Sequence, residues 1–331
     1  MPAAVEAAPL ASSPIAVTLG DPCGIGPEIV LKACAERSPA MPPLRIVGDA
    51  ALLAREAARL GLPMPPQVDS IVELPADLPV GRVDARAGDA AWRFIVHATR
   101  LALRGEVRAI VTAPIAKEAM HAAGHRFPGH TELLAELAGG VDVRMMLANT
   151  ELRTVLVSIH LSLRDALDQV TRENVLQTIV IADTALRRAG IDRPRIAVAG
   201  LNPHAGEAGL FGREELDTIA PAIAEACVRG IEASGPFPPD TVFMRARGLR
   251  EFDVVIAMYH DQGLIPVKYL GIDDGVNVTL GLPFVRTSPD HGTAFDLAGR
   301  PGPDGHGLAD PRSLIAAIRE ADALSARRQR M

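Results

Sequence analysis

Short apolar runs alternate with longer segments of helical periodicity along most of the chain. The runs are rich in β-branched residues and cover 15–19, 44–48, 109–112, 155–159, 195–199 and 254–258. Continuous apolar runs of this length are typical of strands that are buried on both faces. Helical patterns occupy 50–60, 87–103, 131–137, 172–189 and 214–233. This alternation predicts an α/β fold with a largely parallel sheet.

Several predicted strands end in a turn rich in Gly, Pro, His or Asp. These turns are 20–22, 113–114, 202–204 and 259–261. Open α/β sheets bind ligands just beyond the carboxyl ends of their strands. The recurrence of polar turns at such ends therefore predicts one shared cleft.

Length indicates two lobes, because 331 residues exceed the ~250–300 at which a single core usually stops growing. Hydrophobic residues make up 48% and charged residues 22%, close to globular averages, so a disordered or fibrous chain is excluded. The ends, 1–13 and 326–331, are predicted to be disordered.

Charge and aromatic content exclude large anionic partners. Acidic residues outnumber basic ones 40 to 34, and aromatics are only 3% of the chain. Nucleic-acid binding is not expected, since it needs a basic field or aromatic stacking platforms.

Apolar runs stay below the ~18–20 residues that span a bilayer, so no membrane association is expected. Three cysteines without CxxC spacing favour a reducing, cytoplasmic location.

The segment 20–28, Gly-Asp-Pro-Cys-Gly-Ile-Gly-Pro-Glu, follows the first predicted strand. Gly24 and Gly26 permit tight turns, and Pro27 and Glu28 suit the first turn of a helix. The segment lacks both the Lys-Ser/Thr of a P-loop and the third glycine of a dinucleotide fingerprint. A phosphate cradle and a tight strand-to-helix turn are both open interpretations.

Histidines give a more specific signal. His160, His204 and His260 follow predicted strands at similar offsets. Three parallel strands that each end in an imidazole can converge on one divalent cation and leave a position open for substrate. The alternative is that each histidine caps its strand end. Three together favour the metal site, with zinc, cobalt or manganese more natural for nitrogen ligands than magnesium.

Lys268, Asn277 and Arg286 lie in a later region punctuated by Gly and Pro. Lysine supplies a point charge and arginine a planar fork, a combination that suits phosphate or carboxylate. The alternative for each of these residues alone is an ordinary surface position, where the side chain interacts with water and binds no ligand.

Six spaced motifs together resemble the 4-hydroxythreonine-4-phosphate dehydrogenase (PdxA) family, including its 4-phospho-D-threonate and 4-phospho-D-erythronate dehydrogenase branch. They run in order from about 15 to 318 and comprise 20–28, 112–118, 129–132 (Gly-His-Thr-Glu), 202–207 (Asn-Pro-His-Ala-Gly-Glu), 259–263 (Tyr-His-Asp-Gln-Gly) and 277–294.

The resemblance implies a two-lobed isocitrate/isopropylmalate-dehydrogenase-like fold, with a largely parallel sheet in each lobe and the active site in the cleft between them. The expected lobes are 14–128 with 285–331, which carries the cofactor loop, and 129–284, which carries the metal ligands and the dimer interface. A homodimer with shared active sites is implied. So is oxidation of a phosphorylated hydroxy acid with NAD or NADP and one divalent ion, Zn, Mg, Co or Mn.

Site residues are implied position by position. His160, His204 and His260 match the metal ligands, with His260 coming from the other subunit. The positions that match substrate-binding residues are His130, Thr131, Lys268, Asn277 and Arg286.

The segment 291–299 resembles the adenosine-binding loop of isopropylmalate dehydrogenases, which assigns the cofactor to His291, Gly292, Thr293, Ala294 and Asp296. With the cofactor there, the turn at 20–28 is expected to be structural. Asp261, next to a metal ligand, and Lys117 are candidate catalytic residues. The stretch 300–311 is longer than the family's usual continuation, so the loop beside the cofactor is expected to differ.

The first candidate reaction converts 4-hydroxy-L-threonine 4-phosphate to a 3-oxo acid, which decarboxylates to 3-amino-2-oxopropyl phosphate in pyridoxal 5′-phosphate biosynthesis. The alternative is 3-dehydrogenation of 4-phospho-D-threonate or 4-phospho-D-erythronate in sugar-acid catabolism, which segments 87–91 and 123–130 favour. The motifs do not determine whether C2 carries an amine or a hydroxyl. A non-catalytic sugar-phosphate-binding protein is a rival of another class, disfavoured because all three histidines are present.

Overall fold

The chain forms two compact units in the computed structural model, which describes residues 13–36, 41–271, 275–302 and 306–326. The first unit comprises 1–141 and 282–331, and the second comprises 142–281. Segment 129–141, expected in the second lobe, falls in the first unit because its helix packs against another helix there. The predicted disordered ends lie outside the described residues, apart from Ser13 and Ala326.

The strands of the first unit are parallel to one another. Their order is β3 (Val68–Ser70), β2 (Leu44–Gly48), β1 (Ile15–Thr18), β4 (Ala109–Thr112) and β11 (Val285–Pro289). Strands β1 and β4 are buried along their whole length, as their unbroken apolar pattern predicts.

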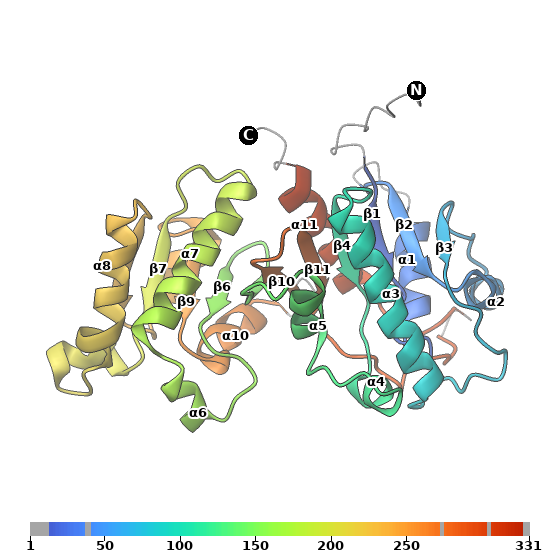
Figure 1. Ribbon diagram of the computed structural model, residues 1–331, viewed down its shortest axis with the longest axis horizontal. Coiled ribbons are helices and arrows are strands. Elements are labelled where there is room, and N and C mark those ends of the chain that lie inside the picture. Colours follow the sequence, from blue (N-terminus) through green and yellow to red (C-terminus); the bar gives the residue numbers. More distant parts are fainter. Residues whose placement is uncertain (1–12, 37–40, 272–274, 303–305, 327–331) are drawn as a thin grey trace. The chain divides into compact units, whose positions relative to one another are not determined.

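Helices cover both faces of this sheet (Figure 1). They are α1 (Gly26–Ala35), α2 (Ala50–Leu60), α3 (Ala85–Leu103), α4 (Lys117–Ala122), α5 (His130–Leu137) and α11 (Arg312–Ala326). The strand order runs outward from β1 to β3 and then returns to β4 through α3. Because such crossovers are right-handed, α3 lies on the face opposite to α1.

Local signals fix where α2 begins and ends. The Asp49 carboxylate accepts hydrogen bonds from the backbone N–H groups of Ala51 and Leu52, and Gly61 ends the helix in the left-handed conformation. An acidic N-cap and a glycine just past the last turn are the strongest boundary signals that a sequence carries. The helix predicted over 50–60 is confirmed without any shift of its ends.

The sheet of the second unit is mixed. Its order is β10 (Val276–Leu280), β5 (Arg144–Ala148), β6 (Arg153–Leu156), β9 (Val254–Ala257), β7 (Ile196–Ala199) and β8 (Ala233–Phe237). Strand β5 is antiparallel to both of its neighbours, whereas β6, β9, β7 and β8 are mutually parallel. The largely parallel α/β architecture predicted from the sequence is therefore confirmed.

The helices of the second unit are mostly short. They are α6 (Leu163–Asp168), α7 (Arg172–Arg188), η2 (Pro203–Gly209), η3 (Glu215–Ile219), α8 (Ala220–Val228), α9 (Val242–Ala246), η4 (Arg247–Leu249) and α10 (His260–Tyr269). The helix predicted over 214–233 ends at Val228. Gly230, at φ 82°, turns the chain toward β8, so that Ile231 and Glu232 belong to the turn and Ala233 begins the strand. No helix in the described part of the chain is long and apolar enough to cross a membrane.

Candidate functional site

Three histidines of the second unit follow three adjacent parallel strands. His160 lies after β6, His260 opens α10 directly beyond β9, and His204 lies in η2 beyond β7. Strand β9 pairs in parallel with β6 on one side and β7 on the other, so the carboxyl ends of all three meet at one edge. The convergence of strand ends predicted from the sequence is thus present in the fold.

His160 and His260 lie close together in one chain. Their ring centroids are 5.7 Å apart, and both residues line a hollow of about 270 Å³ at this edge. Nδ1 of His260 is 2.7 Å from the Asp261 carboxylate. When Nδ1 carries the proton that this contact favours, Nε2 is left as the ligating atom.

His160 and His204 both have left-handed backbone, at φ 44° and 54°. In the turn that holds His204, φ stays positive for six successive residues, 204–209, of which Gly206 and Gly209 are glycines. Each non-glycine residue in this region costs about 1–2 kcal/mol. Strain of this kind persists where the surroundings hold it, and it clusters at functional sites.

The His204 turn is connected to the His260 turn through Gln262. Its Nε2 donates to the Gly200 carbonyl at 2.8 Å, and its Oε1 accepts from the Met258 N–H at 2.7 Å. Gly200 follows β7 and Met258 follows β9. One side chain therefore ties together the ends of two strands that each lead to a candidate ligand.

The donor set fits a divalent ion, because neutral imidazoles on separate loops are common ligands for zinc, cobalt and manganese. Within the described residues of a single chain, no group of three or more His, Cys, Asp or Glu side chains is arranged to hold a metal ion. His160 and His260 form the close pair. His204 lies on a separate turn, and its ring centroid is 6.4 Å from that of Phe211.

Arg286 is the central basic residue of the first unit. Its side chain is 2% exposed and its Nη2 donates to the Thr112 hydroxyl at 2.6 Å. Burial lowers the pKa of the guanidinium to about 9. A buried cation is costly unless an anion compensates it, so this environment favours an anionic ligand. The sequence named Arg286 but gave Thr112 only as part of a motif.

His130 lies near the positive charges of both Arg286 and Lys117. Burial, followed by the nearby charges of Arg286 and Lys117, holds the pKa of His130 well below its usual range. Nε2 of His130 is shielded from solvent and has no hydrogen-bond partner. His130 and Thr131 also form the first turn of α5, where backbone N–H groups attract anions. Lys117 is exposed at the start of α4.

The remaining predicted substrate residues belong to the second unit. Lys268 is exposed near the end of α10. Asn277 lies on β10 opposite Leu147, and its Oδ1 is buried without a hydrogen-bond partner. An unsatisfied buried amide oxygen indicates a bound donor, such as a water or a ligand group.

The predicted cofactor loop packs against the glycine turn at 20–28. The Ile25 N–H donates to the Thr293 carbonyl at 3.0 Å, and a Cβ on Gly24 would approach that oxygen to 2.9 Å. Ala294 has φ 42°, and His291, Gly292 and Asp296 are exposed. Gly24 thus permits the close backbone approach that shapes the loop, which gives the turn the structural role expected of it.

Glu28 anchors the segment that extends beyond the cofactor loop. Its buried carboxylate accepts from the Ala309 N–H at 2.8 Å and from Lys32 Nζ at 2.9 Å. Lys32 also donates to the carbonyls of Gly307 and Ala309. The far end of the longer 300–311 stretch is therefore fixed to α1, although 303–305 lie outside the described residues.

Asp21, in the turn that follows β1, is a buried acid to which the sequence analysis gave no separate role. Its side chain is fully buried, Oδ1 accepts from the Cys23 N–H at 2.8 Å, and Oδ2 has no hydrogen-bond partner. Burial raises the pKa of Asp21 to about 6. Its position inside the strand-end turn is the only sequence signal that marks it.

We expect Asp21→Asn to stabilise the protein at pH 7.5 and to leave it little changed at pH 4. The raised pKa means that this carboxyl supports folding fully below its unfolded value of 3.8 and that this support is lost as pH rises through 6. The difference amounts to about 3 kcal/mol at most. Denaturant unfolding measured from pH 4 to 7.5 tests this.

Asp69→Asn is the matched control in the same unit. Burial alone would raise the pKa of Asp69, but hydrogen bonds from Arg45 and His97 outweigh it and hold the pKa below its usual range. This variant should lose stability at pH 7.5, the opposite sign. A gain for both variants, or for neither, would contradict the assignment of Asp21.

Comparison with known proteins identifies the family. Residues 40–321 match the family model described as pyridoxal phosphate biosynthetic protein PdxA. A 4-hydroxythreonine-4-phosphate dehydrogenase of Beijerinckia indica is 54% identical, over 94% of this chain and 95% of that protein. A D-threonate 4-phosphate dehydrogenase of Salmonella typhimurium is 49% identical, over 86% and 92%.

A solved structure of 4-hydroxythreonine-4-phosphate dehydrogenase from Klebsiella pneumoniae superposes with a TM-score of 0.85. It is 46% identical in sequence, and the match covers 95% of this chain and 99% of that one. Sequence and fold thus agree over nearly the whole chain, and the resemblance predicted from six motifs is confirmed: the chain belongs to the PdxA family.

Proposed function

We propose that this protein oxidises a phosphorylated hydroxy acid with NAD or NADP as hydride acceptor and a divalent ion at the three histidines. The observation that carries the proposal is the placement of His160, His260 and His204 beyond the adjacent parallel strands β6, β9 and β7. The names of the similar proteins support it, since 4-hydroxythreonine-4-phosphate dehydrogenase and D-threonate 4-phosphate dehydrogenase both act on phosphorylated hydroxy acids.

The phosphate group of the substrate is assigned to the basic residues of the first unit. Arg286 offers a guanidinium whose burial makes a dianion a favourable neighbour, and Thr112 orients its Nη2. His130, kept neutral by its surroundings, donates a hydrogen bond, and Thr131 adds a hydroxyl at the start of α5. Lys268 and Asn277 complete the proposed substrate residues.

The three imidazoles would hold the ion, which when bound lowers the pKa of the substrate hydroxyl and polarises the carbonyl that forms from it. Zinc, cobalt and manganese suit the nitrogen donors best, and magnesium is the remaining candidate. Asp261 orients His260 through the contact at Nδ1 and is the proposed residue for moving the hydroxyl proton to solvent. Lys117 is the second candidate for proton transfer.

The oxidation balances with the cofactor as the only oxidant. The substrate hydroxyl loses its proton, and the hydrogen on the same carbon leaves as hydride to the nicotinamide. With 4-hydroxy-L-threonine 4-phosphate the product is a 3-oxo acid. Its carboxylate leaves as carbon dioxide, and protonation of the resulting enolate gives 3-amino-2-oxopropyl phosphate.

The cofactor is assigned to the loop that carries His291, Gly292, Thr293, Ala294 and Asp296. Backbone contacts hold this loop: Ile25 binds Thr293, and Gly81 lies so close that a Cβ there would be 2.8 Å from the Phe295 carbonyl. A loop fixed by backbone contacts can present its own N–H groups and side chains to a nucleotide without reordering.

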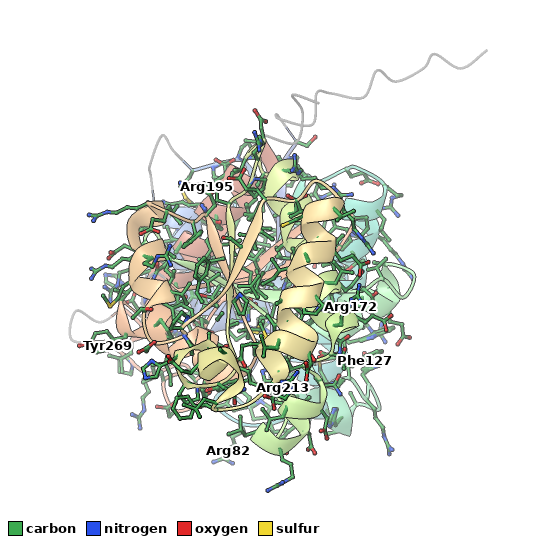
Figure 2. All side chains as sticks on the ribbon, turned by 90° about the vertical axis from the view of Figure 1, so that its left-hand side faces the viewer. Arg82, Phe127, Arg172, Arg195, Arg213 and Tyr269 are labelled. Carbon is green, nitrogen blue, oxygen red and sulfur yellow. The ribbon has the colours of Figure 1, made fainter. Side chains whose placement is uncertain are left out.

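A homodimer is the proposed assembly. Large apolar side chains are exposed around the histidines of the second unit: Leu161, Leu163 and Leu167 after β6, and Ile265 and Tyr269 on α10. Tyr269, 90% exposed, projects outward in Figure 2. An apolar surface of this kind next to a site is typical of a subunit interface. In the homodimer that the resemblance implies, each ion is bound by His160 and His204 of one subunit and by His260 of the other. Because all three histidines lie at one edge of the sheet, both shared sites would lie at this interface. The cytoplasmic location inferred from the cysteines stays a prediction.

The substrate test is a spectrophotometric NADH assay with Mg²⁺, Zn²⁺, Co²⁺ or Mn²⁺ and three substrates side by side. We expect NADH to form with 4-hydroxy-L-threonine 4-phosphate. The alternative substrates are 4-phospho-D-threonate and 4-phospho-D-erythronate. The alternative is supported by the similar D-threonate 4-phosphate dehydrogenase and by contacts of His125 with Asp89 (3.0 Å) and Trp92 (4.2 Å between ring centroids). These contacts tie together the two segments that favour that branch.

A higher kcat/KM with the two phosphorylated sugar acids than with 4-hydroxy-L-threonine 4-phosphate would assign the catabolic reaction to the protein. Failure of all three substrates, with NAD and NADP and each metal, would overturn the dehydrogenase proposal.

A further inference from the structure

Glu215, the first residue of η3, is a buried carboxylate that faces the turn holding His204. Its side chain is 2% exposed. It accepts hydrogen bonds from the N–H groups of Leu201 and Asn202, both at 2.7 Å, and from Asn202 Nδ2 at 3.0 Å. All three donors belong to the two residues that lead from β7 toward His204, so the carboxylate fixes the entry to the turn.

The same carboxylate also lies against the middle of the turn. A Cβ on Gly206 would come within 2.6 Å of Oε2, and one on Gly200 within 3.1 Å of Oε1. Gly206, at φ 79°, is in the left-handed run that includes His204. The backbone therefore packs directly on Glu215, and a glycine at 206 leaves the room that this packing requires.

The turn needs such support because four non-glycine residues in it, His204 among them, have positive φ. Backbone in this region relaxes toward ordinary conformations unless its surroundings hold it. Glu215 combines hydrogen bonds at the entry with packing at the middle. Next to Glu215, Arg213, labelled in Figure 2, forms an exposed ion pair with Asp217 at 2.8 Å.

We propose that Glu215 is a positioning residue that holds the His204 turn in its left-handed conformation, so that the imidazole is preset to bind the divalent ion. The inference rests on the metal site of the proposed function. Nothing in the motif around His204 singles out Glu215, which lies eleven positions later in the chain. It acts through the turn and touches neither substrate nor ion.

The test compares full-length wild type with Glu215→Gln, Glu215→Ala and His204→Ala. The dissociation constant for Co²⁺ or Zn²⁺ is measured by competition with a chromophoric chelator. We expect weakening of roughly 10- to 100-fold for Glu215→Ala, as for other residues that orient metal ligands, and less for Glu215→Gln, which keeps one acceptor oxygen. The visible spectrum of bound Co²⁺ should change in both variants, because it reports ligand geometry.

Asp253→Asn is the matched control. Asp253 in the same unit also accepts a backbone N–H, from Arg195 at 2.8 Å, as well as that residue's Nε at 3.1 Å and Nη2 at 3.0 Å. It precedes β9, at the end of the strand away from His260. We expect this variant to lower the melting temperature as the Glu215 variants do, with metal affinity and spectrum unchanged.

The outcomes separate the two proposals. Wild-type affinity and spectrum in both Glu215 variants, with His204→Ala impaired, would overturn the role of Glu215 and leave the metal site standing. Equal metal binding by wild type and His204→Ala would overturn the metal site and the inference with it. Should Glu215→Ala fail to fold, Glu215→Gln alone decides between these results.

Discussion

Replacement of His204 by alanine is expected to abolish stoichiometric binding of the divalent ion and to lower kcat by about 10³-fold or more. The ion's stabilisation of developing charge is worth several kcal/mol, and each 1.36 kcal/mol changes a rate tenfold. The fold should survive, because His204 is exposed on its turn and Phe211, which its ring contacts, is itself exposed. Metal content of the purified variant and steady-state kinetics are the measurements.

The strained backbone sharpens this prediction. Alanine at 204 must still adopt φ 54°. The substitution therefore removes the imidazole and leaves the backbone strain at this position much the same. A drop in metal content then reports the lost ligand rather than a relaxed loop. His97→Ala serves as the control, because His97 contacts Asp69 in the first unit at 2.9 Å and has no role in the proposed site. Full metal content in His204→Ala would refute the ligand assignment.

Replacement of Arg286 by methionine is expected to move affinity and stability in opposite directions. Loss of a charge-assisted hydrogen bond to phosphate, worth about 1.5–3 kcal/mol, should raise KM roughly 10- to 150-fold. The melting temperature should rise, because burial already lowers the pKa of this guanidinium and methionine fills similar volume without a charge to desolvate. Steady-state kinetics and calorimetry measure the two effects.

Arg108→Met provides the contrast. Arg108, 6% exposed in the same unit, donates to the Ser13 carbonyl at 2.9 Å and to the Ser325 hydroxyl at 2.9 Å, and it forms an ion pair with Asp322. Its removal leaves these partners without a hydrogen-bond donor, so stability should fall while KM stays unchanged. A fall in melting temperature for Arg286→Met as well would show that Arg286 is structural, and an unaltered KM would remove it from the phosphate site.

Elements with strong local signals could be read from the sequence. Strands β2 and β4 and helix α2 have the predicted limits, because a largely apolar run or a capped amphipathic pattern determines each one locally. Strands β3, β5, β8, β10 and β11 were not predicted. Strand β8, Ala-Ser-Gly-Pro-Phe, carries no period that marks a strand, and its pairing with β7 gives it this conformation.

The same distinction between local signals and tertiary contacts applies to the candidate site. The sequence by itself determined the α/β class, the family and the identity of the histidines, because these depend on residue types at fixed spacings along the chain. Only the tertiary structure brought β6, β9 and β7 side by side, buried Arg286 against Thr112, raised the pKa of Asp21 and set Glu215 under the His204 turn. Burial and strain are properties of contacts between residues distant in the chain, and local spacing carries no record of them.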